Sequence, residues 1–307
     1  MDEDWRLPCK TDVLRLRAAM TRAIRRFFLD RDFLEIETPI RIPAPAPESH
    51  IEPVASGEWC LQTSPELCMK RLLAAGYPKI FQICKCFRKG ERGAHHLPEF
   101  TMVEWYRAGT DYLTLMDDCE ILIARIAEEL GLDDAVYWQG RRICLKPPWE
   151  RITVREAFTR YAGLSLEEVL MRDRFDEIMV CAIEPHLGLE RPVFLYEYPA
   201  MLGALARVKA ENQEVAERFE LYIAGLELAN AFSELTDPVE QRLRFEEASR
   251  DLRLKNCPTY PLPERFLASL SRMPPSAGIA LGMDRLAMIL AGQATIDAVV
   301  AFTPESL

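Results

Sequence analysis

Arg88, Phe100, Glu104 and Tyr106 are the residues of this chain whose types and spacing first suggest chemistry. They lie in a segment where apolar and polar residues alternate on both sides of a polar loop, residues 89–98, which is typical of an antiparallel hairpin of half-buried strands. Alternation puts Phe100, Glu104 and Tyr106 on one face of the second strand. If the face of the first strand that carries Arg88 coincides with it, a guanidinium, an aromatic ring, a carboxylate and a phenol line one surface.

Such a surface suits a nucleotide. Arg88 carries a planar, permanently charged fork that matches phosphate oxygens, and Phe100 offers a flat face for a base. The loop adds further charged or titratable groups, namely Lys89, Glu91, Arg92, His95 and His96. A solvent-exposed hairpin tip with one or two salt bridges would have the same composition, so the hairpin alone does not decide between the two interpretations.

A second group of polar residues lies within residues 216–235. Glu227, Asn230 and Glu234 follow one another at intervals of three and four residues, which places them on one face of a helix. They could also lie on a β-hairpin that turns at Ala224–Gly225, provided that a bulge corrects the alternation. Carboxylates are also common on solvated surfaces, so this segment by itself leaves both its structure and its role open.

Two helix starts carry the remaining candidates. The Ser-Pro-Glu sequence at residues 64–66 precedes an apolar helix, residues 67–75, and Ser at the N-cap with Pro at the first helical position is a common start. Near the C-terminus a glycine-punctuated strand runs into an apolar helix over residues 278–290, with Asp284 and Arg285 at the start of the helix. Each junction could be a plain cap or could present polar groups to a ligand.

The elements that must position these residues are amphipathic helices and short strands. Residues 12–29 carry apolar side chains at helical spacing with arginines on the other faces, so we expect a helix there. The other patterns predict a strand within 31–39, a proline-rich loop at 43–53, a strand at 59–63, helices at 112–130, 166–183, 241–254 and 261–270, a strand-to-helix unit at 149–162 and a buried strand at 191–199.

The composition restricts the classes of protein that remain. The chain has 307 residues, is 49% hydrophobic and carries a net charge of −10, which argues against a protein whose main partner is nucleic acid. No apolar run reaches membrane-spanning length. The acidic N-terminus, residues 1–5, lacks a secretory hydrophobic region, so we expect a cytoplasmic protein. Nine cysteines without a Cys-x-x-Cys pair predict reduced, mostly buried thiols rather than a zinc site.

The motifs, taken in order, resemble those of class II aminoacyl-tRNA synthetases, in particular the lysyl branch. Phe-Arg at 87–88 followed by His-x-Pro-Glu-Phe-Thr-Met-x-Glu-Trp-Tyr at 96–106 resembles motif 2. The helix, strand and Thr-Pro of residues 12–39 resemble motif 1, which builds the dimer interface in that family, and residues 278–290 resemble motif 3. The resemblance covers nearly the whole chain. It implies an α+β fold, a class II catalytic core with a mainly antiparallel sheet flanked by helices, as a single domain over residues 1–307 in a homodimer.

The resemblance also implies roles for individual residues. Arg88 and Arg285 would stabilise charge in catalysis, and Glu220 and Glu227 would hold Mg²⁺ beside ATP, because magnesium prefers carboxylate, water and phosphate oxygens. The expected ATP contacts are Arg88, Lys89, Gly90, Glu91, His96, Phe100, Glu227, Leu228, Gly282 and Arg285. The expected amino-acid contacts are Ser64, Pro65, Glu66, Tyr106, Asn230, Phe232, Glu234 and Ala280.

Within the amino-acid site, the family places the 216–235 segment on strands. Glu66 would accept a hydrogen bond from the substrate's amino group, and Glu234 with Tyr106 would bind the far ammonium of a lysine side chain. A carboxylate at the end of the pocket is what a cationic side chain requires, because a buried ammonium left unpaired is costly.

The resemblance narrows further to a family of protein-modifying ligases. Lysyl-tRNA synthetases carry an anticodon-reading barrel before motif 1, and motif 1 begins here within the first few dozen residues, so we expect no anticodon reading. This design resembles the elongation factor P–(R)-β-lysine ligases, which activate β-lysine with ATP and transfer it to a lysine ε-amine of elongation factor P. Ala280 stands where lysyl synthetases typically have glycine, and its methyl would disfavour α-lysine by about 1–3 kcal/mol.

Motif 2 departs from the family at Lys89, Gly90 and Leu97, so the adenine contacts would come from Glu91 or from backbone carbonyls. Two other functions stay open: an enzyme that activates lysine and charges tRNA or another amine, and a non-catalytic paralogue with a regulatory role. The paralogue is disfavoured because every residue expected to act in activation is present, namely Arg88, Glu220, Glu227, Glu234 and Arg285.

Overall fold

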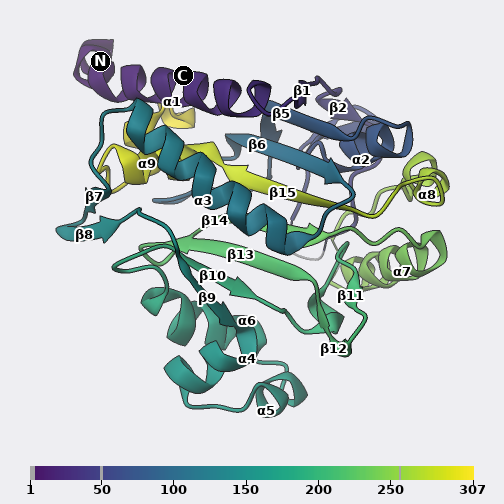
Figure 1. Ribbon diagram of the computed structural model, residues 1–307. Helices are drawn as coiled ribbons and strands as arrows, with labels where there is room; N and C mark the ends of the chain where they lie inside the picture. The colour runs from purple at the N-terminus through teal and green to yellow at the C-terminus, as the bar shows by residue number, and fades with distance from the viewer. Residues whose placement is uncertain (1–3, 49–50, 256) are drawn as a thin grey trace.

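The computed structural model describes residues 4–48, 51–255 and 257–307. Residues 1–3, which begin the acidic N-terminal segment, and Ser49 and His50 of the proline-rich loop lie outside the described residues. Figure 1 shows a central sheet with long helices across one face and a group of short helices beyond one edge.

The central sheet has eight strands and is mainly antiparallel. In spatial order they are β1 (Leu34–Glu35), β5 (Lys79–Phe87), β6 (Glu99–Ala108), β15 (Ser276–Gly282), β14 (Leu226–Ser233), β13 (Arg218–Ile223), β10 (Val193–Tyr196) and β9 (Glu150–Thr153). Only the two edge pairs, β1 with β5 and β9 with β10, are parallel. The α+β class and the mainly antiparallel sheet are therefore as the sequence predicts.

The two faces of the sheet carry different kinds of side chain, because successive side chains along a strand point to opposite faces. Phe81, Trp105 and Ile279 lie on the face that packs against three helices, α1 (Thr11–Leu29), α3 (Tyr112–Glu129) and α9 (Met283–Leu290), and together they form the main hydrophobic core. Figure 1 shows α3 lying across this face, with α1 along its upper edge. The opposite face is left to carry polar groups.

The remaining elements form two further groups. Next to α2 (Glu66–Ala74) lie α7 (Pro238–Leu254) and α8 (Glu264–Leu270), which contribute to a core that also includes Tyr106. Beyond β9 and β10, a separate core is built by α4 (Val154–Ala157), α5 (Leu166–Met171) and α6 (Phe175–Ile178).

Short strands pair outside the central sheet: β2 (Arg41–Ile42), β3 (Ala55–Ser56), β4 (Trp59–Leu61), β7 (Ala135–Trp138), β8 (Arg141–Cys144), β11 (Val208–Lys209) and β12 (Asn212–Ala216). Short 3₁₀ and π segments are η1 (Asp4–Lys10), η2 (Phe158–Ala162), η3 (Met179–Ile183), η4 (Glu184–His186), η5 (Ala200–Leu202), η6 (Ile296–Val299) and η7 (Pro304–Ser306).

The segment that the sequence left open, residues 216–235, forms a β-hairpin. It turns at Ala224 and Gly225, whose φ angles are 56° and 76°, and this is the left-handed conformation that two-residue hairpin turns require. The register shifts between Leu221 and Tyr222, so the required bulge is present. The bulge explains how residues at helical spacing share one face of a strand.

Three details differ from the predictions. The helix after residue 64 begins at Glu66, with Pro65 and not Ser64 at the N-cap position. Residues 166–183 form separate helical pieces, because Asp173 between α5 and α6 has a φ of 51° and interrupts the chain. The thiols are free, as predicted, but only Cys60, Cys86 and Cys119 are buried.

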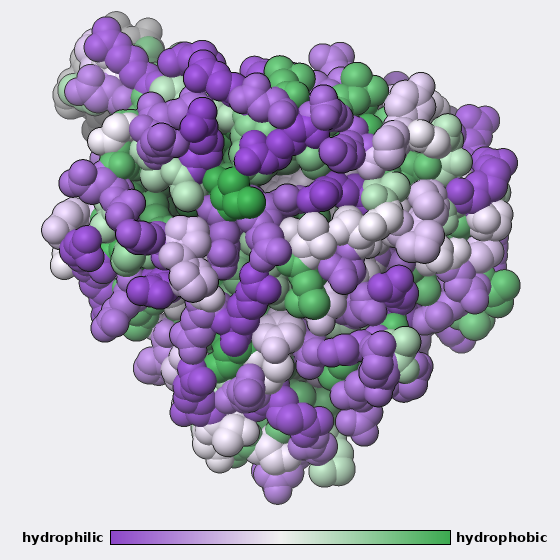
Figure 2. Space-filling model, viewed as in Figure 1, coloured by the Kyte–Doolittle hydropathy of each residue, from purple (hydrophilic) through white to green (hydrophobic). Residues whose placement is uncertain are grey.

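The face of the molecule seen in Figure 2 is largely hydrophilic, with apolar side chains in small separate groups. This agrees with the acidic, charge-rich composition. Within the described residues, no helix is both long and apolar enough to cross a membrane.

Candidate active site

The polar face of the sheet carries two neighbouring rows of side chains, which we call the floor. Hydrogen-bonded register sets each row by pairing residues across five strands. The first row consists of Gln82, Glu104, Ala280, Asn230 and Glu220. The second row consists of Ile80, Tyr106, Gly278, Phe232 and Arg218. Strands far apart in sequence thus bring together residues from motif 2, the 216–235 hairpin and motif 3.

The motif 2 hairpin has the predicted shared face. Cys86 pairs with Phe100, and the backbone N–H of Arg88 donates to the carbonyl of Pro98. The guanidinium carbon of Arg88 lies 5.0 Å from the centre of the Phe100 ring. The carboxylate of Glu91 lies 3.8 Å from the same guanidinium. A cationic fork and an aromatic plane therefore stand next to each other at the end of the floor, as a nucleotide site needs.

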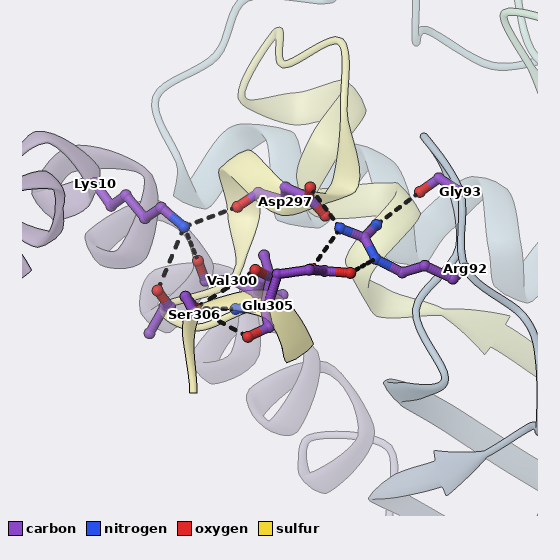
Figure 3. Close-up of polar contacts among 9 residues, drawn as sticks. Lys10, Arg92, Gly93, Asp297, Val300, Glu305 and Ser306 are labelled. Carbon is purple, nitrogen blue, oxygen red and sulfur yellow. Dashed lines mark hydrogen bonds and ion pairs between the residues drawn. The ribbon is translucent and has the colours of Figure 1, made fainter. Parts of the chain in front are cut away.

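Two basic residues of the motif 2 loop do not gather over the floor as expected. Lys89 forms an ion pair with Glu52 at 2.5 Å. Arg92 lies 2.8 Å from a carboxylate oxygen of Asp297 and 2.8 Å from one of Glu305, so it ties the loop to the C-terminal segment (Figure 3). Each cation is therefore held by carboxylates that lie outside the two rows of the floor.

The same C-terminal segment is held at the start of the chain. The Lys10 ammonium donates to the carbonyl of Asp297 at 2.9 Å and to that of Val300 at 2.8 Å (Figure 3). The first helix, the motif 2 loop and the last residues therefore form one anchored unit. This arrangement fixes the outer end of the loop that follows Arg88, a residue predicted to bind the nucleotide.

Arg285 lies where motif 2 and the 216–235 hairpin meet. Its guanidinium donates to the carbonyl of Glu227 at 2.5 Å and to the carbonyl of His95 at 3.3 Å. It also lies 2.5 Å from the Nε2 atom of His96. Burial and the neighbouring Arg285 charge lower the pKa of His96 to about 4, so its neutral ring can accept a hydrogen bond from the arginine.

Glu220 and Glu227 lie on adjacent strands, close enough for their charges to interact. Glu220 accepts hydrogen bonds from Arg218 at 2.7 Å, from Tyr198 at 2.5 Å and from Tyr222 at 2.7 Å. Partial burial and the charge of Glu220 raise the pKa of Glu227 to about 7, opposed by Arg285, Arg88 and Arg218, although its side chain is still 41% exposed. Two neighbouring carboxylates repel each other, and a hard divalent cation bound between them would remove that repulsion.

These carboxylates fit magnesium only if other oxygens complete the site. Within the described residues, no group of three or more His, Cys, Asp or Glu side chains could hold a metal ion alone. Magnesium usually keeps several waters and takes one or two carboxylates together with substrate phosphates. The pair therefore suits a metal that arrives with a nucleotide.

The part of the floor that is predicted to bind the amino acid contains a chain of hydroxyls and carboxylates. The Ser64 hydroxyl donates to Glu104 at 2.6 Å and accepts from the backbone N–H of Glu66 at 3.0 Å. The Tyr106 hydroxyl donates to the other oxygen of Glu104 at 2.8 Å. Burial and the charge of Glu66 raise the pKa of Glu104 to about 8. Glu104 thus orients the serine and tyrosine that the resemblance assigns to substrate binding.

Next to these groups, a lysine that sequence reasoning missed joins two predicted substrate ligands. The Lys70 ammonium lies 2.5 Å from Glu66 and 2.5 Å from Glu234. The side chains of Lys70 and Glu234 are 2% and 0% exposed. The other oxygen of Glu234, Oε1, is buried without a hydrogen-bond partner among the described residues. The signal in the sequence was a lysine four positions after Glu66, on the inner side of the helix.

The predicted residues do not all reach the floor by their side chains. Asn230, Phe232 and Ala280 lie in its two rows, and the Phe232 ring lies 4.8 Å from the Lys70 ammonium that pairs with Glu66 and Glu234. The side chain of Leu228, in contrast, is buried in the main core on the opposite face. Only its backbone lies near the nucleotide side, with its carbonyl 3.7 Å from where a Cβ on Gly282 would be. The bulge of the hairpin is the reason that Leu228 turns away.

Comparison with known proteins agrees with this geometry. Residues 4–306 match the family model described as tRNA synthetases class II (D, K and N). The chain is 38% identical to a protein of Klebsiella pneumoniae subsp. pneumoniae, with 98% of each chain covered. It is 40% identical to proteins of Edwardsiella ictaluri, with 98% of each covered, and of Proteus mirabilis, with 97% of each covered. All three relatives are named elongation factor P–(R)-β-lysine ligase.

Proposed function

The chain belongs to the class II tRNA synthetase family (D, K and N), in the branch of the elongation factor P–(R)-β-lysine ligases, and we propose that it activates (R)-β-lysine with ATP and transfers it to a lysine ε-amine of elongation factor P. The names of the relatives support the acceptor protein and the amino acid. The observation that carries the substrate assignment is Glu234, a fully buried carboxylate with one oxygen free of hydrogen bonds among the described residues. A buried anion of this kind calls for a cationic ligand.

In the first step, the carboxylate of β-lysine attacks the α-phosphorus of ATP, and pyrophosphate leaves. Arg88 and Arg285 stand at the nucleotide end of the floor, where their forks can pair with phosphate oxygens as the charge is redistributed. Phe100 beside Arg88 offers a stacking surface for the base. Magnesium held by Glu220 and Glu227 would neutralise part of the phosphate charge.

In the second step, the ε-amine of the acceptor lysine attacks the carbonyl of the adenylate, and AMP leaves. Both steps depend on positioning and charge stabilisation, and neither needs a protein nucleophile. The amino acid would lie along the floor with its far ammonium between Glu234 and Tyr106 and its other amine near Glu66. Ser64 and Asn230 would flank it, and Ala280 would limit the space beside the α-carbon.

The other residues expected at the nucleotide, Lys89, Gly90, Glu91, His96 and Gly282, border the nucleotide side of the site. Gly282 ends β15, and a Cβ there would make an ordinary van der Waals contact, 3.7 Å from the carbonyl oxygen of Leu228. His96 is neutral and held by Arg285. We propose that the loop backbone from Gly90 to His96 supplies the adenine contacts, since the Lys89 side chain is engaged by Glu52.

We propose a homodimer that uses the motif 1 region. Leu29, Leu34 and Ile40 lie there with exposed fractions of 54%, 48% and 45%, which is unusual for large apolar side chains close together in sequence. Light scattering should give twice the chain mass of 35.2 kDa. A monomer at micromolar concentration would contradict this part of the proposal.

The decisive experiment combines two measurements. ATP–pyrophosphate exchange should be faster with β-lysine than with α-lysine, and mass spectrometry should detect β-lysine on elongation factor P after incubation with ATP. Exchange with α-lysine that equals or exceeds exchange with β-lysine, together with charging of tRNA, would favour a tRNA-charging enzyme. Absence of exchange with both amino acids would favour a non-catalytic paralogue.

A further inference from the structure

Lys70 is buried inside the substrate pocket although no step of the proposed reaction uses it. Its ammonium lies 2.5 Å from both Glu66 and Glu234, and 4.8 Å from the centre of the Phe232 ring. A buried ammonium is costly unless it is paired. Here it is paired with two residues that the proposed reaction assigns to the two amines of the substrate.

The charges of the pocket can be counted from the described side chains. Glu66, Glu104 and Glu234 contribute three carboxylates, and Lys70 contributes one ammonium. Each oxygen of Glu104 accepts from a hydroxyl, those of Ser64 and Tyr106, which is an arrangement that suits an ionised carboxylate. At the outer side, the charge of Glu48 is offset by Arg88 and Arg218. With Glu66, Glu104 and Glu234 all ionised, as binding of ammonium groups requires, the inner pocket that these three residues form with Lys70 therefore lacks two positive charges.

We propose that Lys70 is a specificity-determining positioning residue, which fixes the inner pocket at a deficit of two positive charges and so matches it to a diamino acid. This inference rests on the proposed function. An amino acid with two ammonium groups neutralises the pocket, whereas one with a single ammonium leaves a buried carboxylate unpaired. Lys70 also holds Glu66 and Glu234 at a fixed separation, so that both carboxylates are in place before the substrate arrives.

The electrostatic environment of Lys70 is consistent with this role. Charged groups from several elements interact with it: Glu66 from α2, Glu104 from β6, Glu234 after β14, and Glu48 from the proline-rich loop. Although burial lowers it, the pKa of Lys70 is raised overall by Glu234 and Glu66, so the ammonium stays charged. The same charge lowers the pKa values of Glu104 and Glu234, so without it these carboxylates would hold their protons to a higher pH and would bind ammonium groups less well.

The test compares Lys70→Met with wild type in ATP–pyrophosphate exchange, with β-lysine and ATP each varied. We expect the KM for β-lysine to rise roughly 100-fold in Lys70→Met, because one partner of a buried ion cluster is lost. The KM for ATP should change less than about threefold. The matched control is Arg71→Met, which removes a cation from the adjacent, solvent-exposed position of the same helix and should leave both constants unchanged.

Two further readouts separate charge from structure. The KM of Lys70→Met for β-lysine should fall more steeply between pH 7 and 9.5 than that of wild type, because without the lysine charge its carboxylates lose their protons at a higher pH than those of wild type. Lys70→Arg should lie closer to wild type than Lys70→Gln, since only the first keeps the charge. If Lys70→Met does not fold, as shown by its thermal transition, the comparison of Lys70→Arg with Lys70→Gln carries the test.

The outcomes are distinguishable. A folded Lys70→Met with a wild-type KM for β-lysine, or equal constants for Lys70→Arg and Lys70→Gln, would overturn the role of Lys70 while leaving the proposed function intact. If wild-type protein showed no exchange with either lysine isomer, the proposed function would be overturned, and the inference about Lys70 that rests on it would be overturned as well.

Discussion

Gly278 lies directly opposite Tyr106 in the β6–β15 ladder, and a Cβ at Gly278 would stand 2.1 Å from Cε1 of the tyrosine ring. The same Cβ would lie 2.6 Å from Oε1 of Glu234. Both distances are far shorter than a van der Waals contact. The side chains of Tyr106 and Glu234, two of the proposed substrate ligands, therefore occupy the space over Gly278. The glycine was part of the motif 3 pattern, but its pairing with motif 2 became visible only in the folded sheet.

Gly278→Ala should therefore displace Tyr106 and Glu234 together. We expect a loss of stability of about 1–3 kcal/mol from overpacking, and a larger loss of lysine-dependent exchange than of ATP binding. Thermal unfolding and pyrophosphate exchange measure the two effects. Gly203→Ala is the matched control, since a Cβ there would also crowd its neighbours, at 3.0 Å from the carbonyl oxygen of Ala200 and from Cβ of Ala216, but Gly203 is not a residue of the floor; it should lower stability without a selective loss of lysine-dependent exchange. A fully active Gly278→Ala would contradict the proposed site.

Glu234→Gln removes the negative charge at the end of the pocket and keeps the shape of the side chain. We expect kcat/KM for β-lysine to fall roughly 100-fold or more, because a buried ammonium loses its partner, while the fold stays intact. Glu217→Gln serves as control: Glu217 is also buried and paired, with Arg207 at 2.6 Å, but lies outside the floor. Unchanged exchange in Glu234→Gln would refute its assigned role.

The acidity of the pocket predicts a pH dependence. Burial raises the pKa values of Glu104 and Glu234 from 4.5 to about 8. The native state therefore binds more protons than the unfolded state between these values, and the free energy of unfolding should fall as the pH rises through this range.

Substrate affinity should change in the opposite direction, because an ammonium ligand prefers the ionised carboxylates that form as the pH rises. The increase in Tm caused by saturating β-lysine should be larger at pH 9 than at pH 6.5. Differential scanning fluorimetry across this range measures it, and Glu104→Gln should show a weaker trend. A constant shift in Tm at every pH would show that these carboxylates do not titrate as expected.

Arg285 should matter for the nucleotide and not for the amino acid. Its guanidinium is held by the carbonyls of Glu227 and His95, a geometry that a lysine cannot reproduce with one ammonium. Arg285→Lys should lower kcat/KM for ATP roughly 10-fold to 100-fold, the value of a charge-assisted hydrogen bond of about 1.5–3 kcal/mol. Arg125→Lys, at an exposed ion pair with Glu128 on α3, is the control. A selective effect on the KM for β-lysine would contradict this prediction and would show that Arg285 contributes to binding of the amino acid instead of the nucleotide.

Ala280 lies between Glu104 and Asn230 in the first row of the floor, so its methyl projects beside the proposed amino-acid site. Ala280→Gly should improve exchange with α-lysine relative to β-lysine by roughly 10-fold to 100-fold, because one methyl discriminates by about 1–3 kcal/mol. Parallel exchange assays with the two isomers give the ratio. An unchanged ratio would remove Ala280 from the determinants of specificity.

The sequence by itself determined the family, the fold class and the identity of most polar residues that line the floor. Long motifs such as residues 87–106 combine strand periodicity with groups that suit a nucleotide, and few other folds need that combination. The strand pattern of β5 and β6 also predicted that Arg88 and Phe100 share a face, because alternation along an antiparallel hairpin is a local property.

Only the tertiary structure decided which residues meet across strands and helices that are distant in the chain. It turned Leu228 into the core by a bulge, drew Arg92 to Asp297 and Glu305, and left Gly278 under Tyr106. It also placed Lys70 between Glu66 and Glu234, which are 168 positions apart. Periodicity reports which side of an element a residue faces, but the partner it meets there depends on register and packing between elements, which no local pattern encodes.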